Sequence, residues 1–407
     1  MTSVPLFRRT EDGKLILKNI FIPGQSGAFH IMIQNGCIGS ITPSGEALTA
    51  APFLCLPPLA DLHVHANRAF SVSAQIPRSF HHAIELTSGL FRHATVSDYE
   101  SHSIKLFQRV MTCGTRKIRT HADIDVLTGL KAVEGTLDAR RKVSGCLDVD
   151  VVAFVSGNMD PTRTDSKVML RDAVMAGAAF LGGVPVLNPD PGAAIEALLD
   201  LAIELDVGLD IHLDEHLDPE NIWSGFLADA VMDRNLEGKV WLSHGSAISV
   251  LPSDQKARVI DKIAQAEITV ISLPATNLYL QDREYSGAPR RGLAPVKELA
   301  AAGVPVRLAS DNIQDFFYPY GSGDLLDIAA MAATAAFFED TLLLVSAICD
   351  GHTGIAVGDA ADFILISGES LVEVIANRPR DRYCIQGDKV VNLGQDAVIS
   401  VPHQNCF

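Results

Sequence analysis

The chain has 407 residues, of which 47% are hydrophobic, and 49 acidic against 33 basic residues give it a formal net charge of −16 at pH 7. This length exceeds the usual size of a single core, so we expect one decorated barrel or two domains. The negative charge argues against nucleic acid and an anionic membrane as partners, and it favours a small neutral or cationic molecule.

The sequence contains no export or membrane-insertion signal that we can identify. The opening residues MTSVPLFRRTEDGK lack the apolar core of a signal peptide. No apolar stretch reaches about 18 uncharged residues, the length of a membrane span. The seven cysteines are odd in number, scattered, and form no C-x-x-C pair, so neither a disulfide frame nor a thiolate zinc site is predicted. We therefore expect a cytoplasmic protein in a reducing compartment.

Short β-type runs separated by Gly and Asn turns occupy residues 15–42, and similar runs return at 361–366, 382–385 and 389–392. We predict that these terminal segments pair into one small domain, a β-sandwich. Its two parts are expected to span residues 1–56 and 356–407.

Between these segments, residues 57–355 alternate short apolar strands with longer helix-like stretches, the pattern of parallel β/α units. The strand candidates are 53–65, 117–123, 149–156, 178–185, 208–215, 239–245, 268–274 and 305–311. Eight repeats predict the α/β class and a (β/α)₈ TIM barrel as the catalytic domain. An open doubly wound sheet is the alternative, but no G-x-G-x-x-G follows the first strand.

Polar residues end several of these strand candidates. His63 and His65 close the first one, and strand alternation places both on one face, close enough to share a metal ion. The pair alone is a weak signal, because ordinary hydrogen-bonded histidines show the same spacing. The later strand ends carry His121 and Asp123, His212 and Glu215, His244, and Asp311. Barrel active sites lie at the C-terminal strand ends, so these residues should converge on one rim.

This set of residues resembles the amidohydrolase superfamily, specifically its cytosine deaminase-like branch. The carrying motifs are H-x-H, HLDE, SHG and ASDN. The segments IRTHADID, VVAFV, NLYLQDR with PRRGLAPVKEL, and DFFYPYGSGD are also similar to that branch and to its N-isopropylammelide hydrolase relatives. The resemblance covers essentially the whole chain.

The resemblance implies that one divalent ion, Zn²⁺ or Fe²⁺, is bound by His63, His65, His212 and Asp311. Three imidazoles and a carboxylate suit such an ion and leave a position for water, whose pKa the metal lowers toward ~7. Asp311 would also orient that water; the alternative is that it caps a helix or turn. Strands three and four contain no lysine that could bridge two metals, so a mononuclear site is implied.

Two further residues are expected to act in catalysis. Glu215 would shuttle a proton from the water to the substrate ring and on to the leaving amine, unless it belongs to a solvated acidic loop. His244 would polarise the substrate, unless it is an ordinary rim histidine. For His121 and Asp123 we weigh support of the paired histidines against plain structural packing.

Departures from the family pattern bear on the substrate. Ser156 stands where related cytosine deaminases carry glutamine, and a serine cannot form the same bidentate pair, so Asn158 takes over or the ligand is different. Cytosine itself is therefore not the expected substrate. Arg68 would admit an acidic or carbonyl-rich ligand, or form a salt bridge. Asn312 replaces a second aspartate, which suits a substituted or less cationic leaving group.

Phe316 opens the aromatic run FFYPY and offers a stacking face for a flat heterocycle, or else core packing. Gln281 is a candidate hydrogen-bond partner of a ring carbonyl. The leading hypothesis is a mononuclear hydrolase that removes an exocyclic amino or alkylamino group from a planar pyrimidine-like or triazine-like heterocycle. A cyclic amide hydrolase and a non-catalytic metal-binding barrel are the alternatives. A homo-oligomer remains open, because the sequence identifies no interface.

Overall fold

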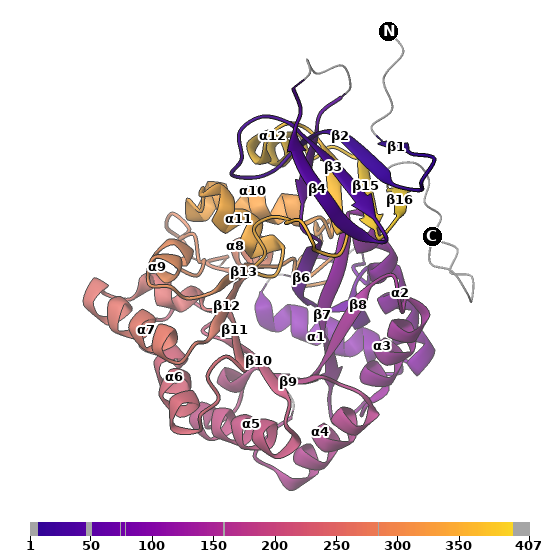
Figure 1. The fold of residues 1–407 in the computed structure, drawn as a ribbon. Coiled ribbons are helices and arrows are strands. Elements are labelled where there is room, and N and C mark those ends of the chain that lie inside the picture. The colour runs from indigo at the N-terminus through magenta and orange to yellow at the C-terminus, as the bar shows by residue number, and fades with distance from the viewer. Residues whose placement is uncertain are drawn as a thin grey trace.

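The computed structural model describes residues 7–45, 51–73, 75–77, 79–157, 159–283 and 285–393. Two eight-stranded sheets organise these residues (Figure 1). The middle of the chain forms a parallel barrel. In Figure 1, strands from the two ends of the chain, coloured indigo and yellow, lie side by side in a second, mixed sheet.

The barrel strands follow one another around the barrel in chain order, from β6 to β13. Their bounds are β6 Leu59–Val64, β7 Thr115–Ile124, β8 Asp148–Val155, β9 Phe180–Gly183, β10 Gly208–Leu213, β11 Val240–His244, β12 Thr269–Ser272 and β13 Val306–Leu308. A bridge between Val64 and Asp311 brings the first and last strands together, and the Asp311 amide donates to the His63 carbonyl at 2.8 Å. The predicted (β/α)₈ barrel is confirmed.

Several barrel strands are buried on both faces, as expected of parallel strands that helices cover on one side and the barrel interior covers on the other. All six residues of β6 are buried, as are the last five of β8. The run VVAFV in β8 is rich in β-branched side chains, which favour strands. The buried strands form a rigid frame for the polar residues at their ends.

Helices surround this frame (Figure 1). Their bounds are α1 Phe80–Phe91, α2 Val96–Thr112, α3 Lys131–Lys142, α4 Thr164–Ala176, α5 Pro191–Leu205, α6 Ser224–Asp233, α7 Ser253–Gln265, α8 Pro274–Leu280, α9 Val296–Ala301, α10 Leu325–Ala336, α11 Thr341–Ile348 and α12 Leu371–Asn377. Helix α2 begins with a capping box formed by Thr95 and Asp98, and buries Leu106 and Phe107 in the barrel core. Within the described ranges, no helix has the length and apolar character needed to cross a bilayer.

The terminal segments form a mixed sheet in the order β16-β15-β14-β5-β2-β3-β4, with β1 paired to β2. The bounds are β1 Phe7–Arg9, β2 Leu15–Phe21, β3 Phe29–Gln34, β4 Cys37–Pro43, β5 Phe53–Leu56, β14 Asp362–Ser367, β15 Arg382–Gln386 and β16 Lys389–Asn392. Because β14 pairs with β5, the two ends of the chain share one sheet. The predicted pairing of the terminal segments is confirmed.

Side-chain alternation in β5 explains how this sheet contacts the barrel. Phe53 and Cys55 point into a core of the terminal sheet itself, whereas Leu54 and Leu56 join the barrel core. The sheet therefore has an internal apolar face and a docking face. In place of the two packed sheets of a sandwich, the terminal segments form one mixed sheet with these two apolar faces.

One strand boundary differs from the prediction. The first candidate strand, residues 53–65, is divided into β5 of the terminal sheet and β6 of the barrel. Pro57 and Pro58 stand between them, and proline has no amide hydrogen for a sheet ladder. The chain therefore changes sheets at the two prolines.

Candidate metal centre and active site

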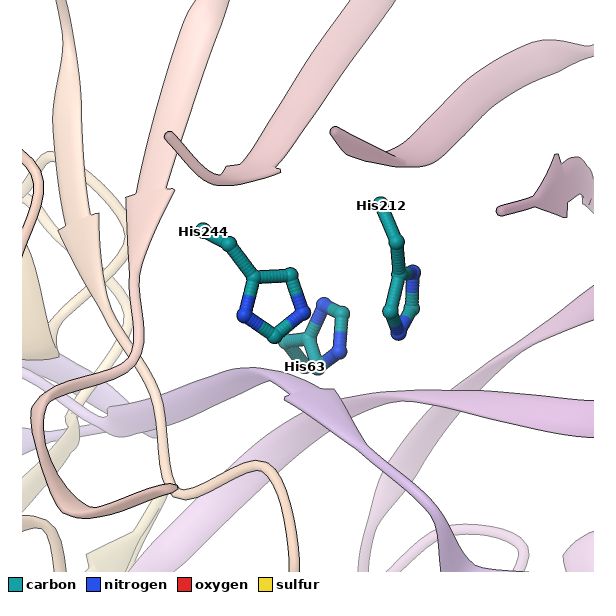
Figure 2. Close-up of side chains that lie close together, drawn as sticks. All are labelled: His63, His212 and His244. Atoms are coloured by element: carbon teal, nitrogen blue, oxygen red, sulfur yellow. The ribbon is translucent and has the colours of Figure 1, made fainter. Parts of the chain in front are cut away.

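The polar residues at the strand ends meet at one end of the barrel. His63 lies on β6, His212 on β10 and His244 at the end of β11, and Figure 2 shows their rings gathered together. His65 follows β6, and Asp311 follows β13. All five side chains are buried. Residues up to 248 positions apart in the sequence are thus brought into one cluster.

Short distances link the four predicted ligands to one another. His65 Nε2 lies 3.3 Å from His212 Nε2 and 3.3 Å from Asp311 Oδ1. Asp311 Oδ1 lies 3.7 Å from His63 Nε2. Ligand atoms bound tetrahedrally at zinc distances are about 3.4 Å apart. Three of the distances among the four side chains are therefore close to that value, and the assignment of the four as one ligand set remains a prediction.

Several of these atoms are buried but have no hydrogen-bond partner in the described protein. They include His63 Nε2 and both carboxylate oxygens of Asp311. Buried polar atoms are normally paired, so a cluster of unpaired acceptors fits the binding of a cation. The donor set of imidazole nitrogens and one carboxylate is the set that Zn²⁺ or Fe²⁺ accepts.

Burial keeps the histidines in the form that binds metal. It lowers the pKa of His63 and His212 well below the ordinary value, and the neighbouring histidines lower it further. For His65, burial acts together with the charge of Arg68. Neutral imidazoles carry a free ring lone pair, which is the form required of a metal ligand.

The backbone is strained at two of these positions. Asp311 has φ +60° and His244 has φ +75°, in the left-handed region that non-glycine residues rarely adopt. Such conformations cost roughly 1–3 kcal/mol and gather at functional sites. His244 ends β11 and Asp311 follows β13, so both strained positions lie where the strand ends meet.

Two combinations of three histidines have ring nitrogens within 4.8 Å of one another. One contains His63, His212 and His244, and the other contains His63, His65 and His121. The His121 ring packs on the His63 ring with a centroid distance of 4.0 Å. His244 and His121 therefore border the ion position, although the resemblance implies neither as a ligand.

Glu215 and His244 form a pair beside the ligands. Glu215 Oε1 lies 3.4 Å from His244 Nδ1, and Asn277 Nδ2 lies 3.0 Å from the same nitrogen. Burial, and then the charge of Asp311, raise the pKa of Glu215 well above its ordinary value. Burial lowers the pKa of His244 to about 4, so its ring is neutral at pH 7. The arrangement provides a carboxyl group that can hold a proton and a neutral ring next to it.

Beneath the ligands lies a buried polar group that the sequence reasoning missed. Asp210 on β10 contacts Arg119 Nη1 at 2.9 Å and Ser243 Oγ at 2.8 Å, and Ser243 Oγ lies 2.8 Å from His63 Nδ1. Burial raises the pKa of Asp210, but His121 and Arg119 outweigh it, so the net shift is downward. Strand alternation was an available signal, because Asp210 precedes His212 by two positions.

The amidohydrolase family model matches residues 81–391 of this chain. The chain belongs to the amidohydrolase family. It is thus a hydrolase acting on carbon–nitrogen bonds, and the family resemblance predicted from the sequence is confirmed. The matched range begins after His63 and His65, so the evidence that they join the site is geometric.

Individual relatives agree with this assignment. The chain is 28% identical over 385 residues to a pterin deaminase of Rhizobium rhizogenes strain K84, and the alignment covers 89% of this chain and 87% of the relative. It is 24% identical over 410 residues to the N-isopropylammelide isopropyl amidohydrolase of Pseudomonas sp. strain ADP, covering 94% and 98%. A 5-methylcytosine deaminase structure from Klebsiella pneumoniae, liganded with phosphonocytosine, superposes with a TM-score of 0.83 at 24% identity, covering 92% and 97%. The structural likeness shows the fold.

Arg68 of the amidohydrolase is buried in an ion-pair network. Its Nη1 lies 3.2 Å from Asp123 Oδ1, its Nε lies 3.6 Å from Asp315 Oδ2, and its guanidinium carbon lies 4.7 Å from the centre of the Phe317 ring. Arg68, Asp123, Phe317 and Ser156 line a cavity of about 110 Å³. The sequence analysis weighed a ligand contact and a salt bridge for Arg68. The structure shows the salt bridge, and its partners are Asp123 and Asp315.

Asn312 and Gln281 make contacts within the protein. Asn312 Nδ2 donates to Asp315 Oδ2 at 2.7 Å, and Asn312 Oδ1 accepts from Thr276 Oγ1 at 3.4 Å. Gln281 Nε2 donates to the backbone carbonyl of Glu215 at 3.2 Å. Both residues thus hold neighbours of the site, Gln281 by supporting the loop that carries Glu215.

Phe316 packs with Phe317 against Ala83 of α1 in a small apolar cluster and is 3% exposed. Asn158 lies outside the described residues. Substrate contacts for Ser156, Asn158, Arg68, Gln281, Asn312 and Phe316 remain predictions.

Proposed function

We propose that this amidohydrolase is a mononuclear metal-dependent deaminase of a planar nitrogen heterocycle. It would replace an exocyclic amino or alkylamino group with oxygen. The observation that carries the proposal is that Glu215 and His244 form a pair beside the short contacts among His65, His212 and Asp311. β8 and β9 contain no lysine, which supports a single metal.

His63, His65, His212 and Asp311 would hold the ion, either Zn²⁺ or Fe²⁺. When bound, it supplies the Lewis acidity that makes a water molecule reactive near neutral pH. Asp311 has two unpaired oxygens, so one can remain available to accept a hydrogen from the attacking water and orient it.

Glu215 would carry the protons. Its carboxylate accepts a proton from the water as the water oxygen bonds to the ring carbon that bears the amino group. The protonated carboxyl group then donates to the adjacent ring nitrogen. The second hydrogen of the added hydroxyl group passes to the amine as the carbon–nitrogen bond breaks, which leaves a ring carbonyl. The raised pKa of Glu215 suits a group that must both accept and donate.

His244 would hold the substrate in place. Asn277 anchors its Nδ1, and its Nε2 is buried without a protein partner, so that nitrogen is available to the substrate or the attacking water. Because the ring is neutral, it acts through hydrogen bonding. Its strained backbone position is consistent with a required placement.

The substrate class follows from the relatives and the site together. Relatives named for pterin, 5-methylcytosine and N-isopropylammelide support a flat aminated ring, and Ser156 in place of glutamine disfavours cytosine. Ser156, Asn158, Arg68, Gln281, Asn312 and Phe316 are the proposed substrate contacts. The net charge of −16 supports a small neutral or cationic molecule, and we place the reaction in the cytoplasm without a nucleic acid or membrane partner.

A substrate panel tests the proposal. Protein loaded separately with Zn²⁺ and Fe²⁺, with metal content verified, is assayed on aminopyrimidines, aminotriazines and aminopterins for ammonia or amine release. We expect release from at least one ring class. Glu215→Gln should lower kcat by about 10²–10⁴-fold with unchanged metal content, whereas Glu237→Gln, at an exposed position, should retain activity.

Two results would contradict the proposal. Metal-replete protein that is silent across the panel would argue against deamination. A new carboxylate without ammonia would identify a cyclic amide hydrolase instead.

A further inference from the structure

A chain of buried polar side chains leads from the first metal ligand to an arginine. Arg119, Asp210 and Ser243 come from three strands of the barrel, β7, β10 and β11, and are at most 3% exposed. We propose that Asp210 and Ser243 are positioning residues that hold the imidazole proton of His63 on Nδ1 and so keep Nε2 free for the ion. This inference rests on the proposed metal centre.

The series of hydrogen bonds begins at the guanidinium group of Arg119, which can only donate hydrogen bonds. Arg119 packs against two aromatic rings, with its guanidinium carbon 3.8 Å from the centre of Phe180 and 4.3 Å from that of Trp241. Its Nη1 donates to Asp210 Oδ2 at 2.9 Å. Because Arg119 and Asp210 are both buried, the guanidinium charge is paired with the carboxylate in a site with little water.

The second step concerns the hydroxyl group of Ser243. Paired with Arg119, the Asp210 carboxylate acts as an acceptor, and Ser243 Oγ donates to its Oδ1 at 2.8 Å. A serine hydroxyl has one hydrogen. Having donated it to Asp210, Ser243 can only accept from a further neighbour.

That neighbour is His63, whose Nδ1 lies 2.8 Å from Ser243 Oγ. Since Ser243 accepts, Nδ1 must carry the hydrogen. A neutral imidazole has only one such hydrogen, so Nε2 keeps a lone pair. This is the nitrogen that lies 3.7 Å from Asp311 Oδ1 and has no hydrogen-bond partner. The hydrogen-bond direction set at Arg119 thus determines which nitrogen of His63 can bind metal.

The test compares Zn²⁺ affinities, measured by competition with a chromogenic chelator on metal-free protein. Ser243→Ala should weaken binding by about 10-fold or more, within the 10–100-fold range of such supporting partners. Ser243→Thr keeps the hydroxyl group and should restore most of the affinity. Ser272→Ala is the matched control, because Ser272 is a buried serine on the adjacent strand whose hydroxyl has no partner. It should bind Zn²⁺ like the wild type.

Asp210→Asn provides a sharper test because it reverses the direction of the hydrogen bonds between residue 210, Ser243 and His63. Arg119 only donates, so the new amide must turn its oxygen to Arg119 and its NH₂ group to Ser243. Ser243 would then accept from the amide and donate to His63 Nδ1, which moves the ring proton to Nε2. The loss of Zn²⁺ affinity should therefore exceed that of Ser243→Ala. Adding Ser243→Ala to Asp210→Asn should bring affinity back to the level of Ser243→Ala alone.

Thermal unfolding of the metal-free variants separates binding from folding, since Asp210→Asn removes the negative charge opposite Arg119 and Ser243→Ala does not. Equal Zn²⁺ affinity of the Ser243→Ala and wild-type proteins would overturn the proposal. A double variant as weak as Asp210→Asn would also overturn it, because the reversed direction would then not be the cause. A wild-type protein that binds no Zn²⁺ would instead refute the proposed metal centre.

Discussion

Asp61 is a buried carboxyl group that the proposed chemistry does not use. It lies on β6, two residues before His63. Its Oδ1 accepts from the amide of Ser310 at 2.9 Å, whereas its Oδ2 has no hydrogen-bond partner. Burial raises its pKa to about 7, although the hydrogen bonds from Ser310 act in the opposite direction. An ionised carboxylate at this position opposes folding.

We predict that Asp61→Asn changes the pH dependence of stability. Between the ordinary pKa of 3.8 and the raised value of about 7, the folded wild type binds more protons than the unfolded chain. Its unfolding free energy therefore falls as pH rises through that window, and asparagine removes this loss. The unfolding free energy of the variant minus that of the wild type should therefore be about 2 kcal/mol larger at pH 8 than at pH 5.

Urea unfolding of both metal-free proteins at the two pH values measures this difference. All other titrating groups are shared and cancel in the comparison. A stability difference that does not change between pH 5 and pH 8 would show that Asp61 does not titrate as expected.

At the scale of elements, the barrel wall depends on close contact between β9 and β10. A Cβ atom on Gly182 would lie 2.4 Å from the backbone oxygen of Asp210 and 2.7 Å from Val152 Cγ1. The first of these atoms is backbone and cannot move without displacing β10. A Cβ atom on Gly183 would find its nearest neighbours at 3.4 Å, which is ordinary contact.

We therefore predict that Gly182→Ala lowers the unfolding free energy by about 1–3 kcal/mol, the usual cost of overpacking. Gly183→Ala should have a smaller effect and serves as the control. Urea unfolding measures both. Equal effects of the two substitutions would mean that β9 moves away from β10 without penalty.

At the scale of the whole molecule, Arg382 joins the terminal sheet to the barrel. It lies on β15 and is 3% exposed. Its guanidinium group donates to the Cys113 carbonyl at 2.7 Å, at the end of α2, and pairs with Asp324 at 2.6 Å. Asp324 also caps α10 by accepting from the amide of Leu326. One side chain from the C-terminal segment thus contacts two barrel helices.

Arg382→Met should lower the unfolding free energy by about 3–5 kcal/mol, because the partly buried Asp324 loses its partner. Arg378→Met removes a neighbouring arginine whose pair with Asp327 is more exposed, at 41% and 29% of the side-chain areas. Its cost should be about 1 kcal/mol or less. Urea unfolding checks both values. If Arg382→Met costs no more than Arg378→Met, the docking of the sheet does not depend on this pair.

Much of the fold was predictable because strand and helix patterns are local. The apolar runs of the barrel strands and the turn residues of the terminal segments lie within a few positions of one another. The convergence of the polar residues at the strand ends was predictable from one further rule, that parallel strands end on the same side of the barrel. The missed boundary at Pro57 and Pro58 was also local, since proline marks the break in the ladder.

The roles of individual polar residues were less predictable, because their partners are distant in the chain. The salt bridges of Arg68 with Asp123 and Asp315 are visible only in the structure, and a substrate contact of Arg68 remains a prediction. Gln281, considered for a ring carbonyl, donates to the backbone of Glu215. Hydrogen-bond partners depend on distances of a few tenths of an ångström, which no sequence spacing defines.

The amino-acid sequence alone determined the barrel, the sharing of one small sheet by the two chain ends, and the candidate ligands. Periodicity and residue chemistry are contained in the order of the residues. Only the tertiary structure decided that Ser243, 180 positions from His63, accepts from its Nδ1 and that Asp210 and Arg119 stand behind it. A buried hydrogen-bond chain has a direction only when all its donors and acceptors are in place, and folding alone brings them together.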